Sequence, residues 1–516
     1  MSALIKSTAS VGSMTLLSRV LGLVRDIVIA RFFSSSDAAD AFFVAFKIPN
    51  FLRRLFAEGA FSLAFVPVLT EYRNQFSAEQ TRDLINRVAG TLGIILLFLT
   101  IVGVAASPVM ISIFAAGFID QPEKFKLTSD MLRLTFPYIL LISMTAMAGG
   151  ILNTWKRFAV PAFTPVLLNL SLIGCALWLS PRLDVPITAL AWGVLLAGVI
   201  QLLFQLPFLY REGLLPKPRW GWKHEGVQKI IKLMIPALFG SSVAQINLLF
   251  DTFIASFLVS GSVAWLYYSD RLLEFPLGVF GIALATVVLP NLSEAHYRDG
   301  NESFNRTLHW AIQLSLLIAV PATFGLFLLA QPILATLFQY GAFVSNDSMM
   351  AAYSLMAYSL GLPAFVMIKI LANGFYARQD TRTPVRIGIH SMIINMVLNV
   401  VFVVAMIRSD FVAPHVGLAL ATTVSAYFNA FCLARALRRD AHLDPLEKFS
   451  HPLLKILIAC IGMGVLIHFM LPEWTQWGEW LWHQRLWQLV LLIVPAIFSY
   501  AMLVWLMGFR KQDFVA

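Results

Sequence analysis

The sequence predicts an all-α polytopic membrane protein with about 14 transmembrane helices. Two observations support this fold class. The 516 residues are 59% hydrophobic and only 13% charged, whereas a soluble protein of this length is about 25% charged. Apolar stretches of 20 or more residues also recur along the whole chain, and these are too long for the strands of a membrane β-barrel. The excess of 38 Lys and Arg over 28 Asp and Glu is therefore a topology signal, and we expect no nucleic-acid partner.

The apolar stretches place the expected helices in order along the chain. They lie at residues 8–32, 37–70, 86–114, 128–153, 160–180, 187–210, 227–258, 263–292, 305–338, 347–375, 385–407, 415–437, 451–471 and 484–508.

Charge in the expected loops determines the orientation. With the N-terminus inside, the inner loops, their flanks and the two tails hold 23 Lys and Arg. The outer loops hold five, which are Lys124, Lys126, Arg182, Arg408 and Arg485. Basic residues concentrate on the cytoplasmic side of membrane proteins, so both termini are expected in the cytoplasm.

A weak internal repeat divides the chain. The matching segments are Ile151-Leu152 with Ile370-Leu371, Thr164-Pro165-Val166 with Thr383-Pro384-Val385, and Pro67 and Glu71 with Pro290 and Glu294. Their offsets of 219 and 223 residues correspond to six helices, an even number, so both copies insert in the same orientation. We expect six-helix lobes at 1–218 and 219–440, with two further helices at 441–516 after a polar hinge at 438–450. Substrates of such transporters bind between the repeats.

Charge inside the first apolar stretch marks a candidate site. Ser18, Arg19, Gly22, Arg25 and Asp26 fall on one face of a helix, and the Leu and Val residues fill the other face. A charge at the centre of a spanning helix costs about 2.5–3.5 kcal/mol, so it normally faces a protein interior or a wet cavity. An amphipathic helix on the membrane surface is the alternative. The loop charges and the repeat favour a spanning helix that faces a cavity between the lobes.

The second and eighth helices carry matching charges, which are Asp40, Arg53, Asp270 and Arg271. Arg54 and Glu58 are four residues apart and suit a local ion pair, which leaves Arg53 for the cavity. A structural charge cluster that holds helices together is the alternative for the eighth helix. Arginine stays charged and binds phosphate oxygens in pairs, so buried arginines suit an anionic, phosphate-bearing substrate.

Common catalytic signatures are absent from the sequence, which has no P-loop, GxSxG, HExxH, CxxC or Rossmann glycine pattern. We therefore expect a transporter and not an enzyme, with no organic cofactor. Because there is no ATP site, an ion gradient, the membrane potential or the substrate gradient must supply the energy.

Four polar residues at middle to outer depth of the expected second lobe form a candidate cation site: Asp251, Asn395, Asn399 and Thr422. Carboxylate, amide and hydroxyl oxygens suit a hard monovalent cation, and Asp251 alone could carry a proton. Interhelical hydrogen bonds between these polar residues are the alternative.

Four segments resemble one known family. They are Ser-Arg-Val-Leu-Gly-Leu-Val-Arg-Asp at 18–26, Asp-Ala-Phe-Phe-Val-Ala-Phe-Lys-Ile-Pro-Asn at 40–50, Arg-Arg-Leu-Phe-Ala-Glu-Gly-Ala-Phe at 53–61 and Tyr-Ser-Asp-Arg at 268–271. The chain resembles, over its whole length, the MurJ (MviN) family of lipid II flippases of Gram-negative bacteria. That family belongs to the multidrug/oligosaccharidyl-lipid/polysaccharide exporter superfamily.

The resemblance implies a substrate, a mechanism and partners. Lipid II, the undecaprenyl-pyrophosphate-linked precursor of peptidoglycan, would move from the inner to the outer leaflet of the bacterial inner membrane by alternating access. A groove at 441–516 would take its polyprenyl tail, and membrane lipids and other cell-wall synthesis proteins would be partners. The substrate-binding residues that the resemblance implies are Ser18, Arg19, Arg25, Asp26, Asp40, Arg53, Asp270 and Arg271.

The resemblance also implies a sodium site, because some members of the family have one that Asp251, Asn395, Asn399 and Thr422 match. The position of Asn399 can be acidic in such sites. Ala264 stands where some relatives have a serine, so it contributes no hydroxyl.

Two other classes of protein share some of these features. A cation-coupled exporter of small drugs would have the same fold, but a drug cation prefers an acidic, aromatic cavity to one lined with arginines. A membrane-bound peptidoglycan polymerase, or a scaffold for one, would handle the same lipid. The buried arginines and the resemblance favour the flippase.

Overall fold

The computed structural model describes residues 2–278, 282–295, 300–439 and 447–509. Side chains are described in these ranges except at 2–10, 56–59, 239–241, 243–244, 282–287, 300–301 and 447–449. The described ranges are helical with short connections and contain no strand. This confirms the all-α fold class. Most of the expected hinge at 438–450 lies outside the described residues.

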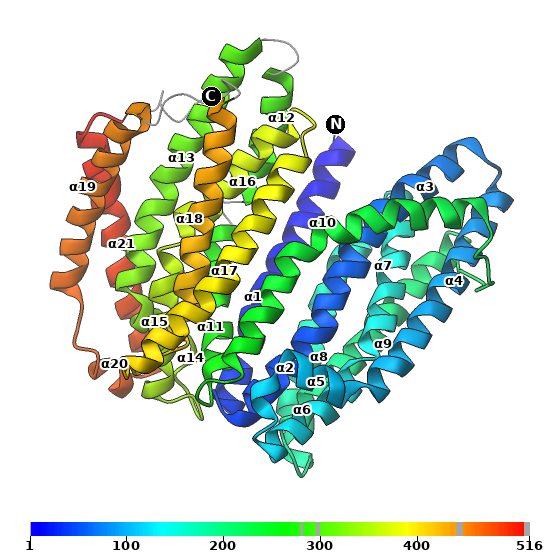
Figure 1. Cartoon of the computed structure of the whole chain (residues 1–516), viewed down its shortest axis with the longest axis horizontal. Coiled ribbons are helices and arrows are strands. Elements are labelled where there is room, and N and C mark those ends of the chain that lie inside the picture. The colour runs from blue at the N-terminus through cyan, green and yellow to red at the C-terminus, as the bar shows by residue number, and fades with distance from the viewer. Residues whose placement is uncertain (1, 279–281, 296–299, 440–446, 510–516) are drawn as a thin grey trace. The chain divides into compact units, whose positions relative to one another are not determined.

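The chain forms two compact units, 1–263 and 264–516. The helices of the first unit (Figure 1) are α1 (Ser2–Phe33), α2 (Asp37–Leu52), η1 (Arg53–Phe61), α3 (Ser62–Gln75), α4 (Ala78–Ala105), α5 (Ser107–Phe114), η2 (Ala116–Phe118), α6 (Pro122–Thr135), α7 (Tyr138–Thr154), α8 (Ala159–Gly174), η3 (Cys175–Leu179), η4 (Ser180–Arg182), α9 (Thr188–Arg211) and α10 (Glu225–Ala255). Those of the second unit, with α11 beginning at its border, are α11 (Ser262–Pro276), α12 (Ile282–Glu294), α13 (Gly300–Leu328), α14 (Ala330–Phe338), α15 (Ser345–Ser359), α16 (Leu362–Tyr376), α17 (Arg382–Arg408), α18 (Val416–Arg439), α19 (Glu447–Met470), α20 (Gln476–Glu479) and α21 (Trp482–Leu506).

Within the described residues, every expected span coincides with helix. Ten helices or helix pairs in the described chain are long and apolar enough to cross a membrane, which makes this a multi-pass membrane protein. The ranges without such a span are α1, α2 to α3, α10 and α11 to α12. These are the expected first, second, seventh and eighth helices, whose charged and polar residues lower their hydropathy. The count of 14 spans is compatible with the structure and stays a prediction.

Helix breaks recur at the offset of the sequence repeat. The break between α4 and α5 falls at Ala106, and the break between α13 and α14 falls at Leu329, 223 residues later. Likewise α6 ends at Thr135 and α15 ends at Ser359, 224 residues later. Proline lies in the first turn of α5, α14 and α16, and directly before α7, where it favours a helix start and cannot continue the preceding helix.

Packing and the repeat divide the chain at different places. α10 belongs to the second lobe by the repeat, yet it packs on η1 and α3 within the first unit. Val227 and Ile230 of α10 join a buried core with Phe65 of α3, Leu84 of α4 and Ile151 of α7. The lobes at 1–218 and 219–440 are defined by the repeat and not by packing, so their boundaries stay predictions.

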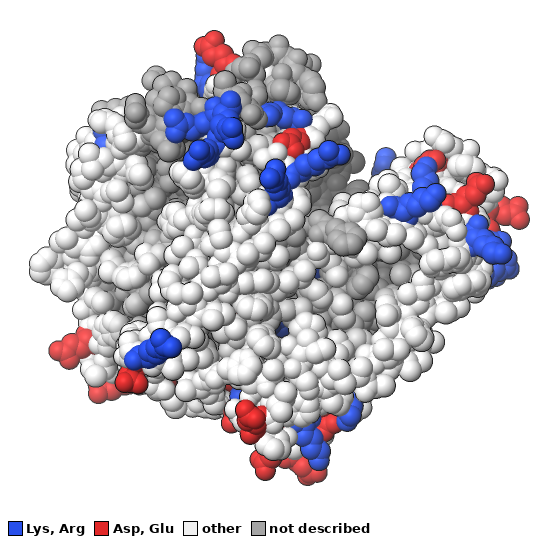
Figure 2. Space-filling view, viewed as in Figure 1, with Lys and Arg blue, Asp and Glu red and all other residues white. Residues whose placement is uncertain are grey.

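The last two long helices are attached to the second unit by two apolar clusters. α19 and α21 pack on each other, and α19 packs on α13. One cluster joins Met463 of α19 to Leu489 of α21 and Ala335 of α14, and the other joins Cys460 to Val320 of α13. In each unit, the face seen in Figure 2 is mostly uncoloured along the middle of the long helices, and charged side chains gather at the helix ends. That distribution suits helices surrounded by lipid.

A buried arginine fastens α21 to α14. Arg485 is counted with the outer loop in the sequence, but it lies in the first turn of α21 and is 5% exposed. Its Nη1 donates to the carbonyl oxygens of Ala335 and Gln339, at 2.9 and 2.8 Å, and its Nε donates to that of Trp480 at 2.9 Å. The carbonyls at the C-terminal end of α14 need donors and carry partial negative charge, so they stabilise this cation.

Arg485→Ala should lower the thermal stability of the purified protein, because it leaves several buried carbonyls without donors, at a cost of about 3 kcal/mol. Arg182→Ala is the matched control, since exposed Arg182 also donates to a helical carbonyl, that of Trp178. The midpoint of thermal unfolding in detergent is the measurement. Equal midpoints for the two variants would contradict the role of Arg485.

Candidate functional site

The first helix has the amphipathic pattern predicted for a spanning helix that faces the protein. Its apolar residues Leu16 and Val20 are 63% and 52% exposed, whereas Arg25 and Asp26 are 4% and 2% exposed. α1 packs along α8 within the first unit. The part of the charged face that carries Arg25 and Asp26 is therefore turned toward protein, and the apolar face is turned away from it, as expected for a helix in lipid.

Arg25, Asp26 and Asn169 form a buried polar cluster. Arg25 donates from Nε and Nη2 to Asp26 Oδ1, at 2.9 and 2.6 Å. Its Nη1 donates to Asn169 Oδ1 of α8 at 3.0 Å, and Asn169 Nδ2 donates to the carbonyl oxygen of Ser18 at 3.0 Å. The carboxylate neutralises the guanidinium, which removes most of the cost of its burial. The amide fixes the guanidinium against the neighbouring helix. Arg19, on the same helix, is exposed.

Arg53 lies where the helical geometry changes. It begins η1, a π-helical segment that follows Pro49. Such segments are frequent at functional sites. Arg53 donates from Nε and Nη2 to Asn50 Oδ1, at 2.9 and 2.8 Å, and is half-buried. The side chain of Glu58 lies outside the described residues, so its expected pairing with Arg54 stays a prediction.

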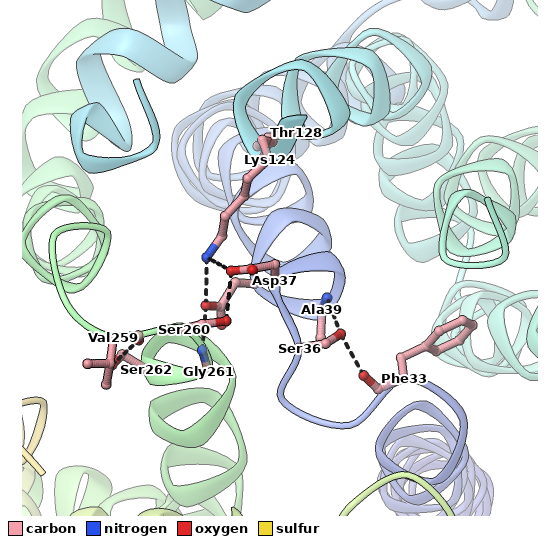
Figure 3. A network of polar contacts seen from close by, with 11 residues as sticks. Phe33, Ser36, Asp37, Ala39, Lys124, Thr128, Val259, Ser260, Gly261 and Ser262 are labelled. Atoms are coloured by element: carbon pink, nitrogen blue, oxygen red, sulfur yellow. Dashed lines mark hydrogen bonds and ion pairs between the residues drawn. The ribbon is translucent and has the colours of Figure 1, made fainter. Parts of the chain in front are cut away.

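Asp40 has partners other than the arginines. Its Oδ2 accepts from Lys124 Nζ at 3.2 Å and from the backbone N–H of Gly261 at 2.8 Å. Asp37, one turn before it, accepts from Lys124 Nζ at 2.6 Å and from Ser260 Oγ at 2.7 Å. Figure 3 shows Lys124 reaching from its helix to Asp37, beside the turn that carries Ser260 and Gly261.

The charges of the eighth helix lie in the second unit. Asp270 and Arg271 are half-buried on α11. Arg271 Nη1 pairs with Glu274 Oε2 at 2.7 Å, and its guanidinium lies 5.6 Å from the centre of the Tyr267 ring. The carboxylate and the ring hold this arginine near the helix that carries it.

Three of the four residues expected at a cation site lie together. In the second unit, Asn395 Nδ2 donates to Thr422 Oγ1 at 3.3 Å and to Ser425 Oγ at 3.2 Å, and Asn399 Nδ2 donates to Asn395 Oδ1 at 3.0 Å. The amide nitrogen of Asn395 faces the two hydroxyls, and that of Asn399 faces the amide oxygen of Asn395. Both amides must therefore rotate before their oxygens can converge on a cation. The fourth residue, Asp251, is half-buried on α10 of the first unit.

The structure thus joins Ser18, Arg25 and Asp26 through Asn169 and places Asp40 in a separate network.

Two residues of these networks were not identified as site residues from the sequence. Asn169 is a lone amide in the apolar run Leu-Leu-Asn-Leu-Ser, and a polar residue inside a spanning helix was the available signal. Lys124 was counted with the outer loops, although it lies in the first turn of α6 and is 6% exposed.

The helices and their buried charges define a class of protein, a polytopic membrane transporter. A solved structure described as an inward-facing conformation of a multidrug resistance MATE family transporter of the MOP superfamily has this fold. It matches 86% of this chain and 99% of its own, with a TM-score of 0.67 and 15% identity. That likeness shows the fold alone.

More specific comparisons identify the family. The family model described as lipid II flippase MurJ matches residues 29–490. The probable lipid II flippase MurJ of Haemophilus influenzae is 49% identical over 512 residues, which are 97% of this chain and 99% of that protein. A solved lipid II flippase MurJ in an inward closed conformation covers 96% of this chain and 97% of its own, with 28% identity and a TM-score of 0.78. The chain belongs to the lipid II flippase MurJ family, a family of transporters and not of enzymes, which confirms the resemblance seen in the sequence.

Asn169→Leu should impair function without removing the protein from the membrane, because Arg25 loses the bond that fixes its guanidinium to α8. The expected effect is about tenfold lower activity, corresponding to one lost hydrogen bond to a charged group. Complementation of a depleted strain, with immunoblotting of membranes, is the measurement. Asn169→Gln should retain more activity, since it keeps the amide. Full activity of the Leu variant would contradict this role.

Proposed function

We propose that this protein translocates lipid II from the inner to the outer leaflet of the bacterial inner membrane by alternating access. Its membership of the lipid II flippase family supports the substrate. The structural observation that carries the proposal is the burial of Arg25 against Asp26 and Asn169 in a helix whose apolar side is exposed. A charge at that depth is costly, and transporters use such charges to bind substrate.

The pyrophosphate of lipid II would bind the arginines, with Ser18, Arg19, Arg25, Asp26, Asp40, Arg53, Asp270 and Arg271 as the substrate-binding set. Guanidinium groups bind phosphate oxygens in pairs and stay charged at membrane depth. Asp26, Asn50 and Glu274 would hold Arg25, Arg53 and Arg271 while substrate is absent, because each already accepts from one of them. Phosphate oxygens would then replace these acceptors, so each guanidinium would keep hydrogen-bond partners throughout.

The same proposal covers orientation and partners. Both termini would lie in the cytoplasm, because basic residues concentrate in the expected inner loops. The polyprenyl tail would lie in a groove at 441–516, where α19 and α21 expose large apolar side chains such as Phe469 and Phe498. Other cell-wall synthesis proteins would be partners, since they make and consume lipid II.

Depletion of this protein should cause lipid II to accumulate on the inner leaflet, and a plasmid copy should restore its exposure outside. Arg25→Ala should fail to restore it and Arg25→Lys should restore it poorly, because lysine cannot bind phosphate in a bidentate manner. Labelling of external lipid II is the measurement. Arg31→Ala, which changes an exposed arginine of the same helix, is the control and should restore exposure fully. Normal external lipid II in depleted cells would refute the proposed function.

We also propose that a monovalent cation, Na⁺ in the first instance, couples to transport through Asp251, Asn395, Asn399 and Thr422. The clustering of the two amides and the hydroxyl supports this, since rotation of the amides would turn three oxygens toward one another. Asp251 would supply the negative charge.

Transport by purified protein in liposomes should be faster with an imposed sodium gradient, and Asp251→Asn should lose that response because it removes the carboxylate charge. Asp410→Asn, which changes an exposed carboxylate beyond α17, should respond like the parent. If sodium has no effect on the parent and Asp251→Asn transports at the same rate, the coupling proposal is wrong.

A further inference from the structure

A second charged network lies at one end of the helices of the first unit and shares only Asp40 with the proposed substrate-binding set. Five residues form it, and we call it the outer latch: Asp37, Asp40, Lys124, Ser260 and Gly261. Its members come from the first turns of α2 and α6 and from the turn that follows α10. In the expected topology all three places lie on the outer side of the membrane, so the network lies at one end of the helices.

Lys124 is the centre of the outer latch. Its ammonium group bonds to Asp37 and Asp40 and lies 4.3 Å from the centre of the Phe118 ring. A cation in the first turn of a helix is unfavourable, because the helix dipole is positive there. The two carboxylates, in the first turn of α2, are favourably placed by the same rule. Lys124 is therefore stabilised by its partners and not by its own helix.

The turn after α10 is shaped to meet these groups. Gly261 has φ of +94°, which favours glycine, and in that conformation its N–H donates to Asp40. A second contact lies beside it, where the N–H of Gly117 donates to Ser256 Oγ at 3.1 Å. A Cβ at Gly117 would lie only 2.3 Å from the carbonyl oxygen of Ser256, so the close approach requires glycine.

The second unit holds its corresponding helices together with different chemistry. Lys124 is the third residue of α6 and contacts Asp40, the fourth residue of α2. Asp347 is the third residue of α15, and its Oδ1 accepts from Nε1 of Trp265, the fourth residue of α11, at 3.2 Å. A contact between these helix starts is thus common to both repeats. In the first unit this contact is an ion pair, and a hydrogen bond from a further segment, the turn after α10, joins it.

We propose that Lys124 is a positioning residue of transport, which closes the outer ends of α2 and α6 against the turn after α10 and releases them when the cavity opens outward. The inference rests on the proposed alternating access. The repeat places α2 and α6 in the first lobe and the turn after α10 in the second, so the outer latch crosses the boundary that must open. The side chain of Asp37 is 58% exposed, which lets water compete for Lys124 and makes the closure reversible.

Accessibility of a single cysteine tests the inference directly. Phe51 lies eleven residues, or about three turns, beyond Asp40 on the same side of α2, and it is half-buried. Phe51→Cys would be placed in the full chain with Cys175, Cys432 and Cys460 replaced by serine. Spheroplasts would then be labelled from outside with a charged, membrane-impermeant thiol reagent.

Lys124→Met should raise the labelling rate roughly tenfold, because charge-assisted hydrogen bonds that favour the closed form are lost. Gly117→Ala should also raise the labelling rate, because its Cβ would push Ser256 away, and it leaves no buried charge unpaired. Arg157→Met is the matched control, because Arg157 pairs with Glu212 at 2.8 Å within the expected first lobe and outside the outer latch, and it should leave the rate unchanged.

Unchanged labelling in Lys124→Met and Gly117→Ala, with both proteins present in the membrane, would overturn the inference. If Lys124→Met fails to accumulate, Gly117→Ala and Asp37→Asn decide the matter, since Asp37 is too exposed for its charge to be needed for folding. Labelling requires no lipid II. The two proposals can therefore fail separately. If the variants change the labelling rate but the protein does not move lipid II, the outer latch is supported and only the proposed substrate is refuted.

Discussion

Burial of charge within an apolar protein is the constraint on which the rest of the structure depends. A guanidinium or ammonium group away from water needs an opposite charge and hydrogen-bond partners, because leaving it unpaired costs a large fraction of the stability of a typical domain. Each buried cation considered above meets this requirement differently. Arg25 has a carboxylate and an amide, Lys124 has two carboxylates and an aromatic ring, and Arg485 has the carbonyls at the end of a helix.

These three solutions correspond to three uses. Carbonyls cannot leave their helix, so the bonds of Arg485 are permanent and serve stability. The carboxylate of Asp26 is held on the same helix as Arg25, so it can neutralise the guanidinium while substrate is absent and give way to phosphate oxygens when substrate binds, as a binding group requires. Lys124 draws its partners from another helix and they are bonded in turn to a distant segment, so its bonds can be broken by separation of those segments. The location of the partner thus decides what a buried charge can do.

The sequence was sufficient for the fold class, because hydrophobic length and helical periodicity are local properties of the chain. It was also sufficient for the burial of Arg25 and Asp26, which follows from their position on the polar face of the first helix. It did not identify Asn169 or the burial of Lys124. Both depend on which helices pack side by side, and the apolar patterns of α6 and α8 do not specify their neighbours. The count of basic residues in the expected loops likewise placed Lys124 and Arg485 in solvent. Hydropathy alone does not distinguish the polar first turn of a helix from the end of the preceding loop.

Translocation of lipid II by purified protein in liposomes, compared between the parent chain and Arg25→Ala, addresses the central claim most directly. Labelled lipid II would be incorporated in one leaflet and its appearance in the other followed with an impermeant quencher. If the buried guanidinium binds the pyrophosphate, the parent moves the lipid and the alanine variant does not. A cooperative thermal unfolding transition in both proteins would show that both are folded. Equal rates for the two proteins would contradict that role, and the absence of movement by the parent under every imposed gradient would contradict the function itself.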